Sequence, residues 1–187
     1  PAIAFCVSAS GSTMFHLRAE TPADAPAIDQ LLDRAIGPDR TAKVSYAFRA
    51  GVPPVGDLAR VAVAADGGRV VGTIRYWPVA VGDAAALLLG PLGVEPVLKG
   101  RGIGRALLRD SLARVRARPA PPAVLLVGDA AYYGPLGFVT APATTVMPGE
   151  DPARLMVDAA GSPPPAGTLG PWRALRAADR PDAMAVD

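Results

Sequence analysis

The sequence is poor in cysteine and histidine, with one of each, Cys6 and His16, among 187 residues. One cysteine cannot form an internal disulfide, and zinc sites require several Cys or His side chains at short spacings. A disulfide framework and a zinc site are therefore excluded, and no metal is expected. The low cysteine content is typical of a reducing compartment, so we expect a cytoplasmic protein.

The sequence also lacks a run of about 18 apolar residues, so it predicts no membrane-spanning helix and no membrane partner. The first letters, PAIAFCVSASGSTM, contain a short apolar run without the preceding positive charges of a secretory signal. We expect residues 1–13 to form a loosely ordered extension. Residues 14–187 are predicted to form a single domain, because half of all residues are apolar and can build a sizeable core.

Neither sign of charge dominates: 19 basic and 17 acidic residues give a formal net charge of +2. This balance does not indicate a nucleic-acid partner. An alternative is an arginine-rich binding surface on the helix expected over residues 102–116. At 100° per residue the arginines scatter around that helix rather than form one stripe, which weakens this alternative. They are Arg101, Arg105, Arg109, Arg114, Arg116 and Arg118.

Hydrophobic periodicity predicts a strand from Met14, followed by an amphipathic helix that Thr21 caps and Gly37 ends. A short helix is expected around residues 42–50. Three strand-like runs with glycine-containing turns then predict an antiparallel meander. The later expected elements are a helix over 102–116, a buried strand ending at 128, a short helix over 130–136, strands over 137–140 and 154–159, and a loop over 161–170.

The third strand of the meander is interrupted by Gly90-Pro91. Proline cannot donate to a strand ladder and glycine loosens it, so we expect a bulge or a splay at this position. The stretch KGRGIGRALL, residues 99–108, then places three glycines at every second position before the expected helix. Glycine tolerates unusual dihedral angles, and the first N–H groups of a helix have no intrahelical partner, so this turn favours a phosphate.

Two known phosphate motifs do not match the glycine-rich turn. The P-loop form GxxxxGK[ST] is absent, and GxGxxG counted from Gly100 fails because Arg105 stands at its last position. A structural turn that binds nothing is the alternative for such a motif.

The residues around the turn resemble the GNAT family of acetyl-coenzyme A-dependent N-acetyltransferases. In that family a V-x-P-like strand end precedes [QRK]-x-x-G-x-[GA] and a helix. The residues that match in register are Val94, Pro96, Lys99, Gly102 and Gly104. Downstream, Tyr133 lies four residues before the pair Gly137-Phe138, as is frequent in the family. The phrases LLLGPLGV, GIGRALL and LLVGDAAYYGPLGF are most similar to the YhbS-like branch.

The resemblance implies the GNAT acyl-CoA N-acyltransferase fold, an α/β (α+β) architecture with a mixed, mostly antiparallel central sheet flanked by helices. It covers about residues 14–141 and leaves 142–187 as a variable C-terminal part. It implies transfer of acetyl from acetyl-CoA to a primary amine of a small molecule or a protein, and it allows a homodimer. Coenzyme A would lie with its pantetheine arm along residues 92–94 and its pyrophosphate on the backbone amides of the turn. The residues implied to bind it are Leu92, Gly93, Val94, Lys99, Gly100, Arg101, Gly102, Ile103, Gly104 and Arg105.

By the same resemblance, Tyr133 is the general acid that protonates the leaving thiolate, and the Val94 N–H stabilises the oxyanion. A phenol titrates near 10, so it can carry this proton at neutral pH. The sequence does not identify the general base. Asp129 is a weak candidate and Glu95 another, with a helix cap or a solvated charge as the alternative for each, while His16 is expected to be structural. Water is a further candidate for the base.

The acceptor side is less defined than the coenzyme side. Candidate lining residues are Tyr46, Arg49, Arg75, Tyr76 and Trp77. Successive strand residues face opposite sides, so Arg75 and Trp77 are expected to share one face and Tyr76 to lie on the other. The missing base also supports a second hypothesis: a catalytically weak or inactive GNAT-fold module that binds acyl-CoA as a sensor.

Overall fold

The computed structural model describes residues 5–7 and 13–174 of the chain. Most of the predicted N-terminal extension, residues 1–4 and 8–12, lies outside the described residues, as do residues 175–187 of the predicted C-terminal part. Within that extension, Phe5–Val7 form strand β1, which pairs antiparallel with β2 (Thr13–Ala19).

Four α-helices and eight further strands follow in the described residues. The helices are α1 (Ala25–Ala35), α2 (Val44–Ala47), α3 (Ile103–Arg116) and α4 (Ala130–Tyr133). The strands are β3 (Arg60–Ala64), β4 (Val70–Val81), β5 (Ala84–Val94), β6 (Ala123–Val127), β7 (Phe138–Thr140), β8 (Thr145–Val146), β9 (Leu155–Asp158) and β10 (Gly167–Pro171). Short 3-10 helices are Pro22–Asp24, Pro38–Ala42, Gly56–Leu58, Pro96–Leu98, Gly134–Leu136, Pro152–Arg154 and Trp172–Ala174.

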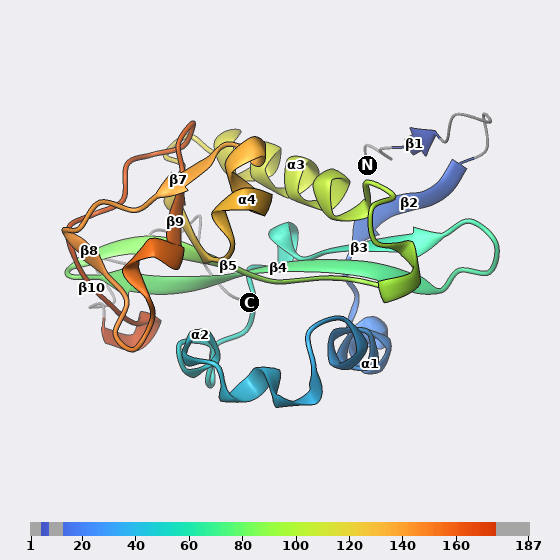
Figure 1. The fold of residues 1–187 in the computed structure, drawn as a ribbon, viewed down its shortest axis with the longest axis horizontal. Coiled ribbons are helices and arrows are strands. Elements are labelled where there is room, and N and C mark those ends of the chain that lie inside the picture. The colour runs from blue at the N-terminus through green and yellow to red at the C-terminus, as the bar shows by residue number, and fades with distance from the viewer. Residues whose placement is uncertain (1–4, 8–12, 175–187) are drawn as a thin grey trace.

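The strands form one sheet in the order β1-β2-β3-β4-β5-β6-β9-β7, and β10 pairs with both β4 and β8. The β5–β6 and β8–β10 pairs are parallel and the others antiparallel. Helices α3 and α4 lie on one face of the sheet, and α1 and α2 lie on the other (Figure 1). This confirms the predicted mixed, mostly antiparallel sheet flanked by helices.

The predicted interruption at Gly90-Pro91 is present. In the β4–β5 pair, Ile74 lies opposite Leu92 and Tyr76 opposite Leu89, so Arg75 faces two residues of β5 and the ladder is bulged. Pairing between β5 and β6 ends at Leu88, and in the described structure no strand takes the place of β6 beside the rest of β5. The two strands therefore separate beyond the bulge, and they leave an opening in the sheet.

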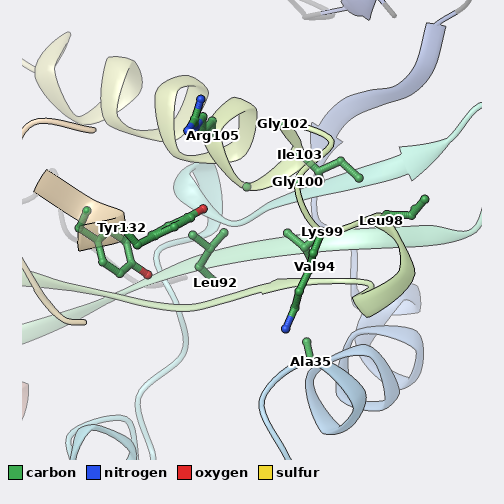
Figure 2. A pocket seen from close by; sticks show the side chains of 12 residues that line it. Ala35, Leu92, Val94, Leu98, Lys99, Gly100, Gly102, Ile103, Arg105 and Tyr132 are labelled. Carbon is green, nitrogen blue, oxygen red and sulfur yellow. The ribbon is translucent and has the colours of Figure 1, made fainter. Parts of the chain in front are cut away.

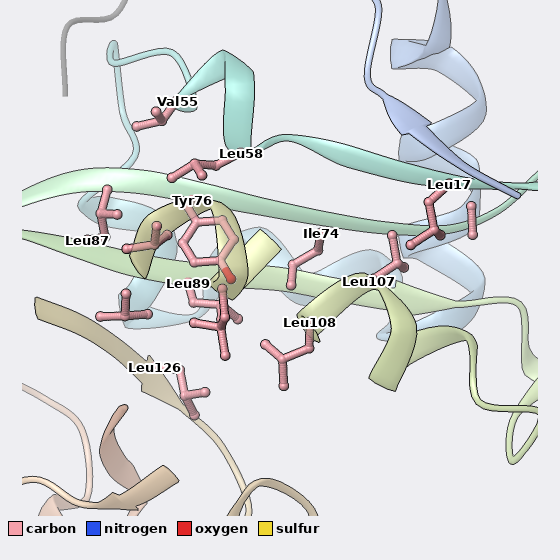
Figure 3. Packing of buried hydrophobic residues seen from close by; sticks show 14 of the residues in the cluster. Leu17, Val55, Leu58, Ile74, Tyr76, Leu87, Leu89, Leu107, Leu108 and Leu126 are labelled. Carbon is pink, nitrogen blue, oxygen red and sulfur yellow. The ribbon is translucent and has the colours of Figure 1, made fainter. Parts of the chain in front are cut away.

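A helix packs through apolar side chains on each face of the sheet around this opening. Helix α3 buries Ile103, Leu107 and Leu112 against β4 and β5, at the helical spacing seen in the sequence. On the opposite face, α1 packs Ile28, Leu31 and Leu32 on strands β3 and β4. Figure 3 shows part of the α3-side cluster, in which Tyr76 lies among leucines. The splayed end of β5 thus has a rigid helix on each side.

The C-terminal part contains strands that the sequence did not reveal. The prediction of a loop over residues 161–170 is wrong at its end, where β10 begins at Gly167. Glycine and proline disfavour strands, but the far end of the long β4 extends beyond β3 and offers a free edge. Leu169 pairs there with Val81, so the strand depends on a tertiary partner.

Candidate active site

The glycine-rich turn adopts the conformation that its sequence predicts. Gly100 and Gly102 both have φ of +82°, in the left-handed region, and a Cβ at either position would meet no atom within 4 Å. Gly102 caps α3, whose first intrahelical bond joins the Ala106 N–H to the Gly102 carbonyl at 2.9 Å. In the described part of the chain, the N–H groups of residues 102–105 have no backbone acceptor. The turn thus presents several free donors and a helix N-terminus to open space, which suits an anion.

A pocket of about 470 Å³ lies between this turn and β5. Figure 2 shows Leu92 and Val94 of β5 on one side, the turn and Arg105 on another, Ala35 of α1 below and Tyr132 at the end. The lining residues are Ala35, Leu92, Val94, Leu98, Lys99, Gly100, Gly102, Ile103, Gly104, Arg105, Tyr132 and Tyr133. We call this the turn pocket. Its apolar strand side and its donor-rich turn match the two chemistries of a pantetheine arm and a pyrophosphate.

The strand register shows which backbone N–H and C=O groups of β5 are not bonded to β4. The Glu95 N–H donates to the Val71 carbonyl at 2.9 Å, and antiparallel pairs alternate between bonded and non-bonded. Gly93 is therefore bonded to Thr73, whereas the N–H and C=O of Leu92 and Val94 point toward the side from which β6 has separated. A linear amide chain in the opening can bond to these groups as a strand would.

Two of the residues predicted to bind coenzyme A do not line the turn pocket. Gly93 faces α1, where an added Cβ would lie 2.7 Å from a Leu32 methyl carbon, and Arg101 is exposed. The alternation of side chains along β5 explains the first case, since Leu92 and Val94 occupy the other face. The rest of the predicted set surrounds the pocket.

Two tyrosines of α4 close the end of the turn pocket. Their rings meet edge to face, with centroids 4.8 Å apart, and the Tyr133 ring also contacts Phe138 at 5.8 Å. The Tyr132 hydroxyl lies over Gly104, where a Cβ would be 2.7 Å from it. Burial raises the pKa of Tyr133 to about 12. Its hydroxyl therefore stays protonated at neutral pH and can donate.

A second, smaller pocket of about 130 Å³ lies on the far side of Tyr133. Its lining residues are Ile36, Lys43, Ser45, Tyr46, Arg49, Leu88, Leu89, Gly90, Pro91, Leu92, Val127 and Tyr133. We call it the bulge pocket, because the β5 interruption forms one of its walls. Leu92 and Tyr133 line both pockets, so the two spaces meet at these side chains.

Neither pocket has a carboxylate, imidazole or thiol among its lining residues. The Asp129 side chain is exposed and caps α4 by accepting from the Ala131 N–H at 2.9 Å. Glu95 is buried and accepts from Arg34 at 3.0 Å, which ties α1 to the end of β5. His16 lies in β2, outside both pockets. Asp129 is thus a helix cap and Glu95 an ion-pair partner, and neither lines a pocket.

The candidate acceptor-lining residues lie at different places in the fold. Tyr46 and Arg49 line the bulge pocket, whereas Tyr76 is fully buried and bonds Ser111 at 2.8 Å. The Arg75 guanidinium is bound by Glu20, and the Trp77 indole donates to the Gly90 carbonyl at 2.7 Å. Tyr132, next to the predicted general acid Tyr133, also lines the turn pocket, and only the tertiary structure shows this.

No metal-binding cluster and no membrane-crossing helix occur in the described residues. They contain no group of three His, Cys, Asp or Glu side chains that could hold a metal. None of their helices has both the length and the apolar character needed to cross a bilayer. Two of the arginines of α3 are held by carboxylates: Arg114 pairs with Asp110 and Arg116 with Asp158.

Strand β5 separates from its parallel neighbour β6 beside a turn suited to an anion. This arrangement is characteristic of the acyl-CoA-dependent N-acyltransferases, so the fold and the site place the protein in that class. The chain belongs to the GNAT acetyltransferase family. The family model described as an acetyltransferase (GNAT) domain matches residues 16–141. The chain is 34% identical over 125 residues to the uncharacterized N-acetyltransferase YhbS of Escherichia coli K12, covering 65% of this chain and 72% of that protein.

Two solved structures share both fold and sequence with this chain. The crystal structure of YhbS from Escherichia coli in complex with CoA has a TM-score of 0.69 and 27% identity, over 84% of this chain and 89% of that one. A GNAT family acetyltransferase from Brucella melitensis in complex with acetyl-CoA has a TM-score of 0.64 and 30% identity, over 83% and 94% of the respective chains. These likenesses agree with the YhbS-like branch expected from the sequence.

Proposed function

We propose that this N-acetyltransferase moves acetyl directly from acetyl-CoA, bound in the turn pocket, to a primary amine that enters through the bulge pocket. The observation that carries the proposal is that the two pockets meet at Leu92 and Tyr133. Two substrates approaching from opposite sides of one opening can react without a covalent enzyme intermediate. The CoA and acetyl-CoA complexes of the two similar structures support the assignment of the larger pocket.

Binding of the coenzyme uses backbone groups more than side chains. The free N–H groups of residues 102–105 would hold the pyrophosphate, and Lys99 and Arg105 would add positive charge. The free N–H and C=O of Leu92 and the C=O of Val94 would bond the amides of the pantetheine arm. Acetyl-CoA supplies the activated acetyl group.

Chemistry takes place where β5 meets α4. The amine nitrogen forms a bond to the acetyl carbonyl carbon, the carbon–sulfur bond breaks, and the electron pair remains on sulfur. We assign the Val94 N–H to the carbonyl oxygen and the Tyr133 hydroxyl to the leaving sulfur, which takes its proton. The incoming ammonium first loses one proton to water, because neither pocket has a carboxylate, imidazole or thiol in its lining. As the amide forms, the nitrogen loses a second proton, which returns through water to the Tyr133 oxygen and restores its hydroxyl.

The experiment is a calorimetric titration of acetyl-CoA into Gly102→Asp and Gly104→Asp. A carboxylate at either position adds bulk and negative charge to the turn, so both variants are expected to lose saturable binding. Gly68→Asp is the matched control, since Gly68 has φ of +70° and an open Cβ direction like Gly102 but lies in the β3–β4 turn. Unchanged affinity in both site variants overturns the assignment.

A thiol-release assay over a panel of amines separates transfer from binding alone. Release of CoA that depends on the amine supports the transferase. Tight acetyl-CoA binding without CoA release from any amine supports the alternative, a GNAT-fold module that binds acyl-CoA as a sensor. A cytoplasmic location is also proposed, supported by a sequence with a single cysteine.

A further inference from the structure

The bulge pocket carries positive charge and has no acid in its lining. Arg49 and Lys43 are its charged residues, and its other lining residues are apolar, aromatic or carry a hydroxyl group. Such a pocket repels a molecule that carries only positive charge, such as a polyamine. It attracts one that brings an anionic group.

Arg49 is the main source of this charge, and it lacks the partner that comparable arginines have. It is 9% exposed, and its Nε and Nη1 are buried without a hydrogen-bond partner in the described part of the chain. The other two buried arginines both have carboxylates: Arg60 bonds Asp110 at 2.8 Å, and Arg40 pairs with Asp29. Arg49 is thus the exception among the buried arginines described.

Aromatic rings fix the orientation of the Arg49 side chain. Its Cζ lies 4.0 Å from the centroid of the Tyr46 ring and 5.8 Å from that of Trp77. Nη2 approaches Gly90, where an added Cβ would be 3.3 Å away. Burial lowers the pKa of Arg49 to about 10, so the guanidinium is still charged at neutral pH. The guanidinium is thus held by the rings, charged, and without a carboxylate partner among the described residues, so it is arranged to receive an anionic group.

Leaving a charge buried and unpaired is costly, since the lost hydration is not replaced. A guanidinium presents parallel N–H groups whose spacing matches the two oxygens of a carboxylate. A carboxylate from the acceptor restores the missing partner while its amine points along the pocket toward Tyr133. A volume of about 130 Å³ suits a small molecule.

We propose that the acceptor is a small amino acid-type molecule, with its carboxylate bound by Arg49 and its amine directed to the junction at Leu92 and Tyr133. This proposal rests on the proposed acetyl transfer, and it adds the chemical class of the acceptor. Arg49 acts here as a specificity-determining residue that touches the substrate and takes no part in the proton transfers.

The test compares kcat/KM for amino acids and ω-amino acids of increasing chain length with that for the matching carboxamides and alkylamines. Wild-type protein is expected to favour the carboxylates by on the order of 100-fold, as when one partner of a buried charge pair is missing. Arg49→Met is expected to abolish this preference, and Arg49→Lys to retain part of it. Arg109→Met, on the exposed face of α3, is the control and keeps the preference.

Acetyl-CoA titration of Arg49→Met is expected to match wild type, which shows that the fold and the turn pocket are intact. Equal kcat/KM for carboxylates and carboxamides in wild type overturns the proposal, as does an equal loss for both classes in Arg49→Met. If no amine releases CoA, calorimetric titration of the same panel into the CoA-bound protein tests whether Arg49 binds carboxylates. Carboxylate binding that Arg49→Met removes supports the Arg49 site although transfer fails, and no carboxylate binding overturns it.

Discussion

Gly104→Ala is expected to separate the stability of the protein from its affinity for acetyl-CoA. Gly104 lies in the first turn of α3, and its Cβ direction points into the turn pocket. An added Cβ would lie 3.5 Å from a Val94 methyl carbon, an ordinary contact, and 2.7 Å from the Tyr132 hydroxyl. Tyr132 is 44% exposed, so its side chain can turn away at little cost.

The two effects of this methyl group have opposite signs. Alanine is favoured over glycine in a helix by up to about 1 kcal/mol, so the free energy of unfolding should stay constant or rise. In a domain of this size, 1 kcal/mol corresponds to roughly 2–4 °C in Tm. An extra methyl in a filled site destabilises binding, and because the family motif also allows alanine at this position, the cost should be small, about 1 kcal/mol or about 5-fold in Kd. A variant with an unchanged or higher Tm and weaker acetyl-CoA binding is therefore expected.

Gly68→Ala is the matched control with the reverse pattern. Gly68 has φ of +70° and no atom within 4 Å of its Cβ direction, so alanine there costs about 1–2 kcal/mol of left-handed strain. Its Tm should fall while acetyl-CoA binds as in wild type. Thermal unfolding and calorimetric titration measure the two quantities. If Gly104→Ala binds acetyl-CoA as tightly as wild type, the coenzyme does not fill the space between Val94 and Tyr132, and the reasoning is refuted.

Three further substitutions test the chemistry of the site and the electrostatics of the fold. Tyr133→Phe is expected to bind acetyl-CoA normally and lower kcat by about 100-fold, with a smaller loss for Tyr132→Phe. Since burial raises the pKa of Tyr133 to about 12, wild-type kcat should not fall between pH 7 and pH 10; a decline near pH 10 that Tyr133→Phe removes contradicts this. Asp24→Asn is expected to cost about 2 kcal/mol of unfolding free energy at pH 7, because the carboxylate is 8% exposed and accepts from Arg18 at 2.6 and 2.7 Å. Arg18 holds the pKa of Asp24 far below its usual range, so this stability is present above about pH 4 and is lost as the pH falls. In urea unfolding the gap between wild type and Asp24→Asn should narrow at pH 3, and an undiminished gap contradicts the assignment.

Features that depend on neighbouring residues could be predicted from the sequence. The apolar face of α3 follows from its helical spacing, and the bulge opposite Gly90-Pro91 follows from the missing donor of proline. The left-handed glycines before α3 were likewise apparent from their spacing. The coenzyme-binding residues around the turn pocket were predicted from the resemblance to the GNAT family.

Features that depend on distant partners could not be predicted. The β10 strand exists because the end of β4 has a free edge, and no local pattern around Gly167 indicates it. Arg49 was a candidate from its residue type, but its missing carboxylate is visible only when all surrounding elements are in place. Asp129 and Glu95 were open between base and structural roles, and only their hydrogen-bond partners assign them to a cap and an ion pair.

The missing carboxylate base and the unpaired arginine belong to one electrostatic arrangement. A carboxylate near the amine would stabilise its ammonium form and raise its pKa, which opposes nucleophilic attack. Arg49 and Lys43 act in the opposite direction, since nearby positive charge favours the neutral amine. A free cationic amine would then be repelled, unless the same molecule carries an anion to pair with Arg49. Once paired with Arg49, the acceptor's carboxylate no longer stabilises its own ammonium group, and Lys43 adds positive charge, so the amine loses a proton to water more readily.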